Sequence, residues 1–265
     1  METVTFLCFY IHNPVGTIPC CPWPTLAYGE SPMIEVRPFD RLGHANHGWL
    51  DARHHFSFAH YHDPARMHWG ALRVWNDDMI APGTGFGTHP HRDMEIITYI
   101  REGAITHTDS LGNTGRTEAG DVQVMSAGTG IRHAEHNREN VATRLFQIWI
   151  MPDRAGHAPS WGTRSFPKAD RAGQFVVLAS GRTGDGDALP INADARVLGA
   201  TLKAGQVVEY PLGATRLGYL VPARGRVDIE GTTVGERDGA AISDTETLHV
   251  RALEDSEIIL VDTLA

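Results

Sequence analysis

The stretch 83-GTGFGTHPHRDMEIITYIREGAITHTDSLGNTGRTEAGDVQVMSAGTGIRHAEHN-137 decides how this 265-residue chain is interpreted. It contains two short clusters, His89-Pro90-His91 and His133-Ala134-Glu135, and in each cluster two potential metal ligands are spaced i, i+2. Residues with this spacing on a β-strand point to the same face. Two adjacent strands could therefore direct three imidazoles and one carboxylate at a single point.

This donor set indicates a class of metal. Imidazole nitrogens with a carboxylate favour Fe(II), Ni, Co, Mn, Cu or Zn over Mg or Ca. Four protein ligands would leave part of an octahedron open for a substrate or O₂. The alternative interpretation is that these are ordinary polar residues at strand ends, because a single His-x-His pair is a weak motif.

Composition and charge limit the classes of partner. The chain is 42% hydrophobic and 21% charged, with a formal net charge of -9, which argues against direct binding of nucleic acid or an anionic membrane. Cys8, Cys20 and Cys21 are the three cysteines, so the rest of the chain has no internal disulfide, as is typical of a reducing, cytoplasmic compartment. No apolar run reaches the length of a membrane span.

The histidines are unevenly distributed. Twelve of the fifteen lie between His44 and His136, so any imidazole chemistry belongs to the first half of the chain. Residues 1–32 are different again, with five prolines, all three cysteines and no Lys or Arg. We interpret Met33 as the natural start and residues 1–32 as an extension that is disordered or not native. The alternative is a genuine N-terminal arm with little order.

The rest of the chain is patterned as strands and turns. Alternating runs such as Arg144–Ile150, separated by Gly- and Asn-containing turns, predict an all-β protein. Prolines and glycines concentrate in residues 152–174 and indicate a connector there. The predicted organisation is an N-terminal metal-binding domain over 33–155, a connector over 156–174 and a second β domain over 175–265.

A faint internal repeat links the two halves. Residues 98–103 (TYIREG) are echoed by residues 220–225 (LVPARG), and Gly120 and His133 by Gly239 and His249. The second half lacks the His-x-His and His-x-Glu pairs. Two barrels of one type, with a metal site only in the first, would produce this pattern, although chance similarity between strand-turn units would produce it too.

The motifs resemble those of a known family. Gly83-x5-His89-x-His91-x3-Glu95 is similar to the first cupin motif, and Gly130-x2-His133-x3-Asn137 to the end of the second. HPHRDMEIITY and AGTGIRHAEHN resemble the pirin family of bicupins. RLGHANHGWL with FSFAHY resembles its bacterial members described as quercetin 2,3-dioxygenases. The resemblance covers Met33 to the C-terminus and implies two tandem jelly-roll-like cupin barrels, with the metal site in the N-terminal barrel.

The resemblance also implies a ligand set, namely His89, His91, His133 and Glu135. Seven residues rather than six separate Glu95 from Gly103, and in the pirin pattern that glutamate is not a ligand. Gly128 stands where general cupins have proline, which is again similar to pirins. His107 and Asn137 are candidates for a supporting shell around the ligands. A surface or hairpin histidine is the alternative for His107.

The activity implied by the resemblance is oxygenolytic opening of the heterocyclic ring of a flavonol such as quercetin, with loss of carbon monoxide. It requires one divalent transition metal, with Fe(II) expected first and Ni, Co, Mn, Cu or Zn as alternatives. Glu135 is the candidate catalytic base for the 3-hydroxyl proton. Phe86, Met125, Phe146 and Ile148 would line an apolar pocket or pack in the core, and core packing is expected by default.

Two other functions compete with the dioxygenase. A metal-binding regulatory or redox-sensing module that acts through a protein partner needs the same ligands, because a fold does not fix a function. A zinc-dependent isomerase or hydrolase of the cupin class is the third. Oxygen consumption with quercetin separates the first from the others.

Overall fold

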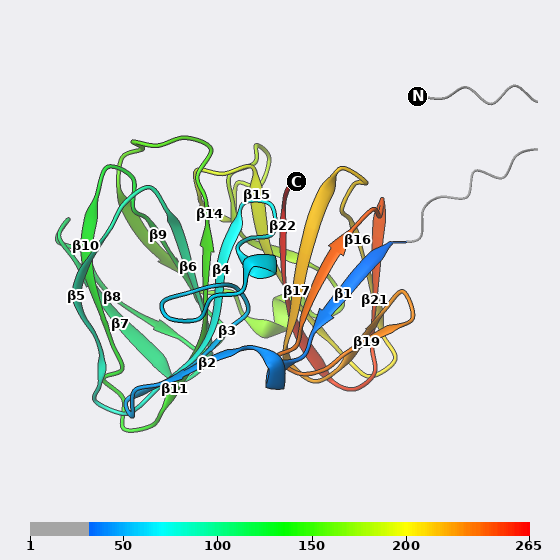
Figure 1. Cartoon of the computed structure of the whole chain (residues 1–265), viewed down its shortest axis with the longest axis horizontal. Helices are drawn as coiled ribbons and strands as arrows, with labels where there is room; N and C mark the ends of the chain where they lie inside the picture. Colours follow the sequence, from blue (N-terminus) through cyan, green and yellow to red (C-terminus); the bar gives the residue numbers. More distant parts are fainter. Residues whose placement is uncertain (1–31) are drawn as a thin grey trace, which may run out of the picture. The chain divides into compact units, whose positions relative to one another are not determined.

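The computed structural model describes residues 32–265, and strands dominate this part of the chain (Figure 1). The extension expected over residues 1–32 falls almost wholly outside the described residues. The expected all-β fold with two cupin barrels is confirmed. The helical segments of the described part are three short 3₁₀ turns, η1 (Phe39–Arg41), η2 (Pro64–Arg66) and η3 (Lys168–Arg171). No helix within residues 32–265 is long and apolar enough to cross a membrane.

The N-terminal barrel is formed by eleven consecutive strands: β2 (Gly43–Asn46), β3 (Leu50–His54), β4 (Leu72–Ile80), β5 (Gly85–His91), β6 (Glu95–Glu102), β7 (Ala104–Asp109), β8 (Thr114–Glu118), β9 (Val122–Ser126), β10 (Ile131–His136), β11 (Thr143–Ile150) and β12 (Ser160–Arg164). They form a seven-stranded sheet in the order β12-β9-β6-β11-β4-β3-β2 and a four-stranded sheet in the order β5-β10-β7-β8.

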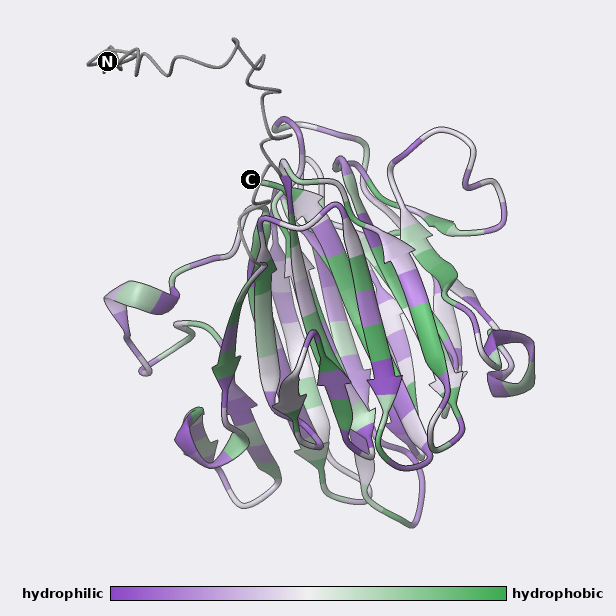
Figure 2. Ribbon diagram, turned by 90° about the vertical axis from the view of Figure 1, so that its right-hand side faces the viewer, coloured by the Kyte–Doolittle hydropathy of each residue, from purple (hydrophilic) through white to green (hydrophobic). Residues whose placement is uncertain are grey.

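The C-terminal barrel contains β1 (Met33–Arg37), β13 (Val176–Ser180), β14 (Leu189–Pro190), β15 (Ala195–Leu202), β16 (Val207–Pro211), β17 (Arg216–Arg224), β18 (Val227–Ile229), β19 (Thr232–Val234), β20 (Gly239–Ser243), β21 (Thr247–Ala252) and β22 (Ser256–Leu264). Its seven-stranded sheet has the order β1-β20-β17-β22-β15-β13-β14, and its four-stranded sheet has the order β16-β21-β18-β19. Along most strands hydrophobic and hydrophilic residues alternate (Figure 2), as expected for sheets with one face inward.

The two strand orders match position by position, which supports the internal repeat. β6 occupies the same place as β17, and β10 the same place as β21, and these are the strands that carry the echoed residues. The match fails at one side chain. His133 is buried on β10, whereas His249 on β21 is exposed and bonds Glu230. His249 therefore faces away from the interior of its barrel.

Two strands depart from the expected domain boundaries. β1 pairs along its whole length with β20 of the C-terminal barrel, and it lies beside the orange strands in Figure 1. β12, within the expected connector, pairs with β9 of the N-terminal barrel. A local sequence pattern does not state which free sheet edge a strand will cover. β12 and β1 occupy corresponding edges of the two seven-stranded sheets, beside β9 and β20 respectively.

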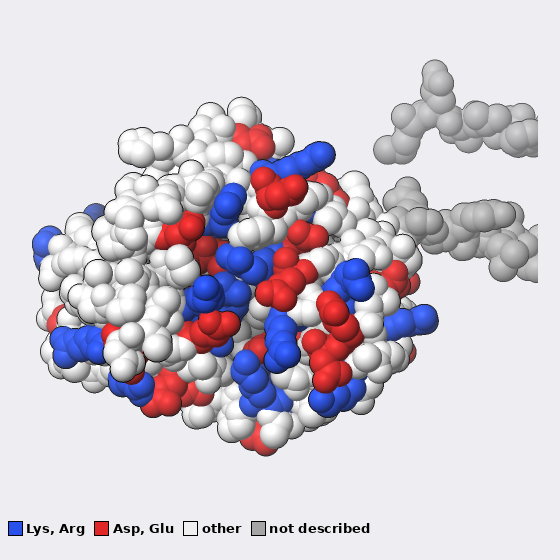
Figure 3. Space-filling model, turned by 90° about the horizontal axis from the view of Figure 1, so that it is seen from below, with Lys and Arg blue, Asp and Glu red and all other residues white. Residues whose placement is uncertain are grey.

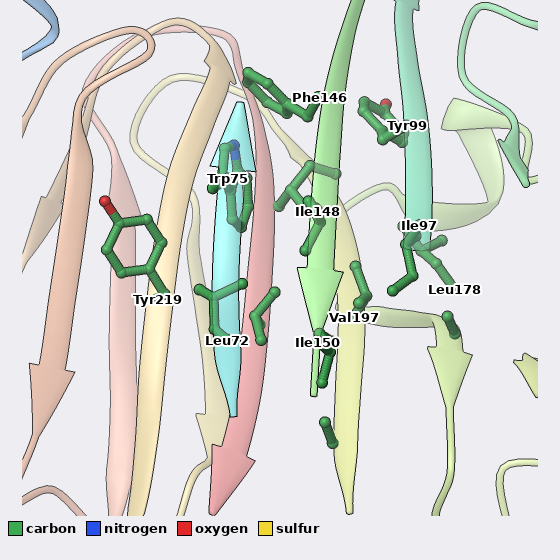
Figure 4. Close-up of a cluster of buried hydrophobic side chains, with 14 of the residues drawn as sticks. Leu72, Trp75, Ile97, Tyr99, Phe146, Ile148, Ile150, Leu178, Val197 and Tyr219 are labelled. Carbon is green, nitrogen blue, oxygen red and sulfur yellow. The ribbon is translucent and has the colours of Figure 1, made fainter. Parts of the chain in front are cut away.

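The large sheets of the two barrels pack against each other through a continuous hydrophobic layer (Figure 4). Trp75, Ile97 and Phe146 reach it from the N-terminal barrel, and Val197 and Tyr219 from the C-terminal barrel. Phe146 and Ile148 belong to this layer, so their expected default of core packing holds. On the face in Figure 3 basic and acidic side chains are intermixed.

The interiors of the barrels differ. The C-terminal barrel encloses a single apolar cluster that includes Leu248, Val250 and Leu260. The N-terminal barrel has two smaller apolar clusters, centred on Ile100 and on Met125. Its buried polar side chains include His54, Asn76, Asp78, Thr98, His107, Thr117, Gln123, His133, Glu135 and Gln147.

Candidate metal centre

Three histidines of residues 83–137 converge where β5 pairs with β10. His133 lies opposite His89 in the register, and Ile131 lies opposite His91. One ring nitrogen from each of the three histidines falls within 4.8 Å of the others. Within residues 32–265, groups of three or more such close donors occur only in the N-terminal barrel.

A β-bulge sets the position of Glu135. The register of β10 against β5 shifts between His133 and Glu135, so that Glu135 lies opposite Phe86. Bulges re-aim side chains and are common beside active sites. Gly85 permits the close approach of the strands, because a Cβ there would collide with the Glu135 carbonyl oxygen. The sequence spacing thus predicts the face of each residue but not this local shift.

The histidine cluster fits a divalent transition metal. The Nε2 atoms of His89 and His133 are 3.1 Å apart. Two nitrogens at about 2.1 Å from one ion and at right angles would be separated by about 3 Å. Burial and the neighbouring histidines lower the pKa of His91 to about 4 and the pKa of His133 to about 3. Both rings are therefore neutral near pH 7 and keep a nitrogen lone pair for a metal.

Glu135 belongs to a second group that overlaps the first. One of its oxygens lies within 4.8 Å of ring nitrogens of His107 and His133. Its carboxylate is buried and accepts hydrogen bonds from Gln123 and from Gln147, the latter at 2.9 Å. Burial raises the pKa of Glu135 to about 7, although the two amide bonds oppose this shift. No cation of the described residues pairs with it, so its charge is available to a metal.

Gln123 and Gln147 are site residues that the sequence analysis did not identify. They reach Glu135 from β9 and β11, and both are buried. A signal was present, because each is a polar residue with an apolar neighbour on either side. Asp78 on β4 is a further buried residue that the sequence analysis did not identify. Burial raises its pKa well above the ordinary value, and the charges of Asp77 and Glu135 add to the effect.

His107 lies directly opposite Glu135 in the register of β7 and β10. Its Nε2 is 3.1 Å from an oxygen of Asp109, and its ring stacks on Trp161 with centroids 4.8 Å apart. Asp109 also accepts hydrogen bonds from Asn113 and Leu111, which lower the pKa of Asp109 against the opposing effect of burial. These contacts place His107 beside the candidate ligands in a fixed orientation.

Asn137 and Glu95 lie elsewhere. The side chain of Asn137 is buried and bonds the backbone of Ile80, Ala81, Val141 and Glu139, so it anchors a loop rather than a ligand. The carboxylate of Glu95 accepts hydrogen bonds from Ser126 and, at 3.2 Å, from Asn192 of the second half of the chain. Glu95 therefore has other partners, as the pirin pattern implies.

Aromatic rings border one side of the cluster. Trp149 contacts His91 edge-on with centroids 5.0 Å apart, and Phe58 contacts Trp149 in the same way at 5.5 Å. The ring centroids of Phe86 and His89 are 6.3 Å apart. A solvent-open recess of about 430 Å³ reaches His91 from outside and is flanked by Arg92 and Arg132. Phe86 therefore lies near the cluster, whereas Met125 packs in an apolar cluster.

The family follows from comparison with known proteins. Residues 35–150 match the pirin family model, and residues 177–263 match the model of a quercetinase C-terminal cupin domain. A pirin-like protein from Caulobacter vibrioides is 66% identical over 230 residues, which are 87% of this chain and 99% of the relative. The chain belongs to the pirin family.

Other pirin relatives carry a more specific name or a metal. The quercetin 2,3-dioxygenase of Escherichia coli K12 is 43% identical over 231 residues, which are 87% of this pirin and 98% of the relative. The crystal structure of the bacterial pirin YhhW from Escherichia coli, in complex with nickel(II), superimposes with a TM-score of 0.82 at 42% identity. That alignment covers 88% of this pirin and 99% of the solved chain.

Proposed function

We propose that this pirin is a metal-dependent dioxygenase that opens the heterocyclic ring of flavonols such as quercetin. The observation that carries the proposal is the convergence of three imidazoles beside a buried carboxylate that has no cationic partner among the described residues. The name of the Escherichia coli relative supports the reaction class and a small-molecule substrate used with O₂.

The ligands in this proposal are His89, His91, His133 and Glu135, and Fe(II) is the metal we expect first. When bound, such an ion supplies a Lewis acid and a one-electron centre for a substrate oxygen and O₂. The nickel in the YhhW crystal structure is compatible with the same donor set. Selectivity among these metals depends on geometry and supply.

Glu135 is the residue that we assign to the 3-hydroxyl proton of the flavonol. A proton acceptor is most effective when its pKa lies near the working pH. Burial brings the pKa of the Glu135 carboxyl to about 7 in the metal-free protein. Gln123 and Gln147 donate to both of its oxygens, so the carboxylate is held in one orientation while a lone pair on each oxygen stays free.

The rings beside the histidines are compatible with a flat aromatic substrate. Trp149 packs edge-on against His91 and Phe58 packs against Trp149, and aromatic pairs are favourable at these centroid distances. A flavonol bound at the metal would meet these rings before it met the apolar layer between the barrels.

The test is oxygen uptake by protein reconstituted with Fe(II) under anaerobic conditions and then given quercetin and air. We expect quercetin-dependent oxygen consumption with release of carbon monoxide, and no consumption by the His91→Ala variant. Glu135→Gln is expected to retain the fold and lose turnover. Stoichiometric metal binding without oxygen consumption would contradict the proposal and favour the regulatory module that acts through a protein partner.

A further inference from the structure

A chain of hydrogen bonds connects an aromatic residue of β11 to the candidate ligand Glu135. The indole Nε1 of Trp149 lies 3.3 Å from Oε1 of Gln147, and Nε2 of Gln147 lies 2.9 Å from Oε2 of Glu135. We propose that Trp149 and Gln147 are positioning residues that orient the Glu135 carboxylate for the metal. The inference rests on the proposed metal centre and deepens it.

The chemistry of the indole fixes the direction of this chain. The Trp149 Nε1–H group can only donate a hydrogen bond, so its partner atom on Gln147 must be the amide oxygen. The amide NH₂ of Gln147 must then point the other way, toward Glu135, which needs donors because it is buried. A flipped amide would place its NH₂ against the indole N–H and its oxygen against a carboxylate oxygen. Trp149 therefore selects the productive rotamer of Gln147.

Gln123, the other amide donor to Glu135, has no donor-only partner that would fix the orientation of its amide. Its Oε1 accepts from the Thr117 hydroxyl at 3.3 Å, and its Nε2 also reaches the Thr98 hydroxyl at 3.3 Å. A hydroxyl both donates and accepts, so these partners tolerate either orientation of the Gln123 amide. The fixed orientation of the carboxylate consequently depends on the Gln147 side of the site.

Trp149 also contacts one of the candidate ligands and a neighbouring aromatic ring. Its ring packs edge-on against His91 and against Phe58. A molecule that displaces or compresses this ring would move the indole N–H, and through Gln147 it would shift the carboxylate. The arrangement couples the aromatic side of the site to the oxygen ligand, whereas the imidazole of His89 has a separate contact with the Gly87 carbonyl.

The experiment measures the affinity of the full-length protein for nickel(II) alone, by competition with a chelator. Partners that orient a metal ligand typically contribute about 10–100-fold in affinity. We expect Trp149→Phe and Gln147→Leu each to weaken nickel binding by about 10-fold or more. The double variant should bind no more weakly than Gln147→Leu alone, because Trp149 acts through Gln147. Trp69→Phe is the matched control, because it also removes an indole hydrogen bond, here to the Gly218 carbonyl of the C-terminal barrel.

A second readout separates orientation of the ligand from general damage. The visible spectrum of the cobalt(II)-loaded protein depends on coordination number and geometry. It should change in the same way in Trp149→Phe and Gln147→Leu, and it should be unchanged in Trp69→Phe. Additive losses in the double variant, or a Trp149→Phe protein that matches the control, would overturn the inference and leave the proposed dioxygenase intact. A wild-type protein that bound no nickel or cobalt would overturn both.

Discussion

Two buried carboxylates, one from each barrel, have opposite surroundings. Asp262, on β22 of the C-terminal barrel, pairs with Arg216 and, at 3.3 Å, with Arg182, and accepts from Tyr210 at 2.6 Å. Glu135, on β10 of the N-terminal barrel, is held only by the neutral amides of Gln123 and Gln147. Asp262 therefore has its charge compensated within the protein. Glu135 lacks this compensation and can receive it from a metal.

The difference extends to the strands around these residues. β5 and β10 direct His89, His91 and His133 together, whereas β16 and β21, at the same places in the other barrel, contribute Val208, Tyr210, Leu248 and Val250 to an apolar cluster. The same strand order supports both interiors. The framework is therefore set by backbone pairing, and the chemistry is set by a few inward positions on two strands.

Removing a proposed metal ligand from the N-terminal barrel should have the largest effect on the difference between the two barrel interiors. We expect His133→Ala to weaken nickel(II) binding by more than about 100-fold, because even residues that only support ligands contribute about 10–100-fold. His249→Ala, at the echoed position of the other barrel, should leave binding unchanged because His249 is exposed. Chelator competition measures both affinities. Equal losses in the two variants would place the metal outside the N-terminal barrel.

Neutralising the two carboxylates should separate a structural acid from a functional one. Asp262→Asn removes the compensating charge of the buried Arg216, so the free energy of unfolding should fall by about 3–5 kcal/mol. Glu135→Gln in the metal-free protein at pH 7 should not lower it, since no cation loses a partner and a neutral amide replaces a buried carboxyl. Urea denaturation measures both values. A larger loss for Glu135→Gln would contradict the comparison.

The pH dependence of stability should sharpen the assignment of Glu135. In the metal-free fold its pKa is about 7, against 4.5 for the ordinary side chain, so between these values the folded state holds a proton that the unfolded state has released. The stability contributed by the protonated carboxyl is fully present below about pH 4.5 and is lost as the pH rises through 7. The wild type minus Glu135→Gln difference should fall by about 3 kcal/mol across this window.

Urea denaturation of both proteins at several pH values measures this difference. Subtracting the variant removes the contribution of the site histidines, whose lowered pKa values act in the opposite direction. Glu209→Gln, at an exposed carboxylate of β16, is the control and should show no such trend. A flat difference for Glu135→Gln would mean that the carboxyl is already ionised in the metal-free fold.

The smallest effect is expected at the layer between the barrels. Tyr219 bonds Nδ1 of the buried His55 at 2.9 Å, so Tyr219→Phe should lower the free energy of unfolding by about 1 kcal/mol. Nickel affinity should not change, because this layer lies apart from the ligand strands. A change in affinity of 10-fold or more would show that the two barrels communicate, and that the second barrel is more than a scaffold.

Much of the fold could be predicted from local patterns. Alternating strands and Gly-rich turns gave the all-β class, and the i, i+2 spacing correctly placed His89 and His91 near His133. The echo between the halves correctly paired β10 with β21, because both strands follow similar turns. The echo does not extend to burial, because His249 is exposed whereas His133 is buried.

The contacts that hold the site could not be predicted in the same way. Gln147 meets Glu135 only because β9, β10 and β11 bring their inward faces together, and no spacing in the sequence states that distance. The destination of β1 is equally non-local, because its pattern fits any free sheet edge. Asn137 follows the alternation of β10 but turns to the backbone of a neighbouring loop.

β1 lies at the start of the described chain but pairs with β20 of the C-terminal barrel, so the chain cannot be cut cleanly between the two barrels. A cut between the barrels would leave the first fragment with a strand that has no partner and the second with an open edge at β20. Open edges invite pairing with other chains. The two barrels therefore form one structural unit. The C-terminal barrel cannot be removed without leaving β1 unpaired, even if that barrel never contacts a substrate.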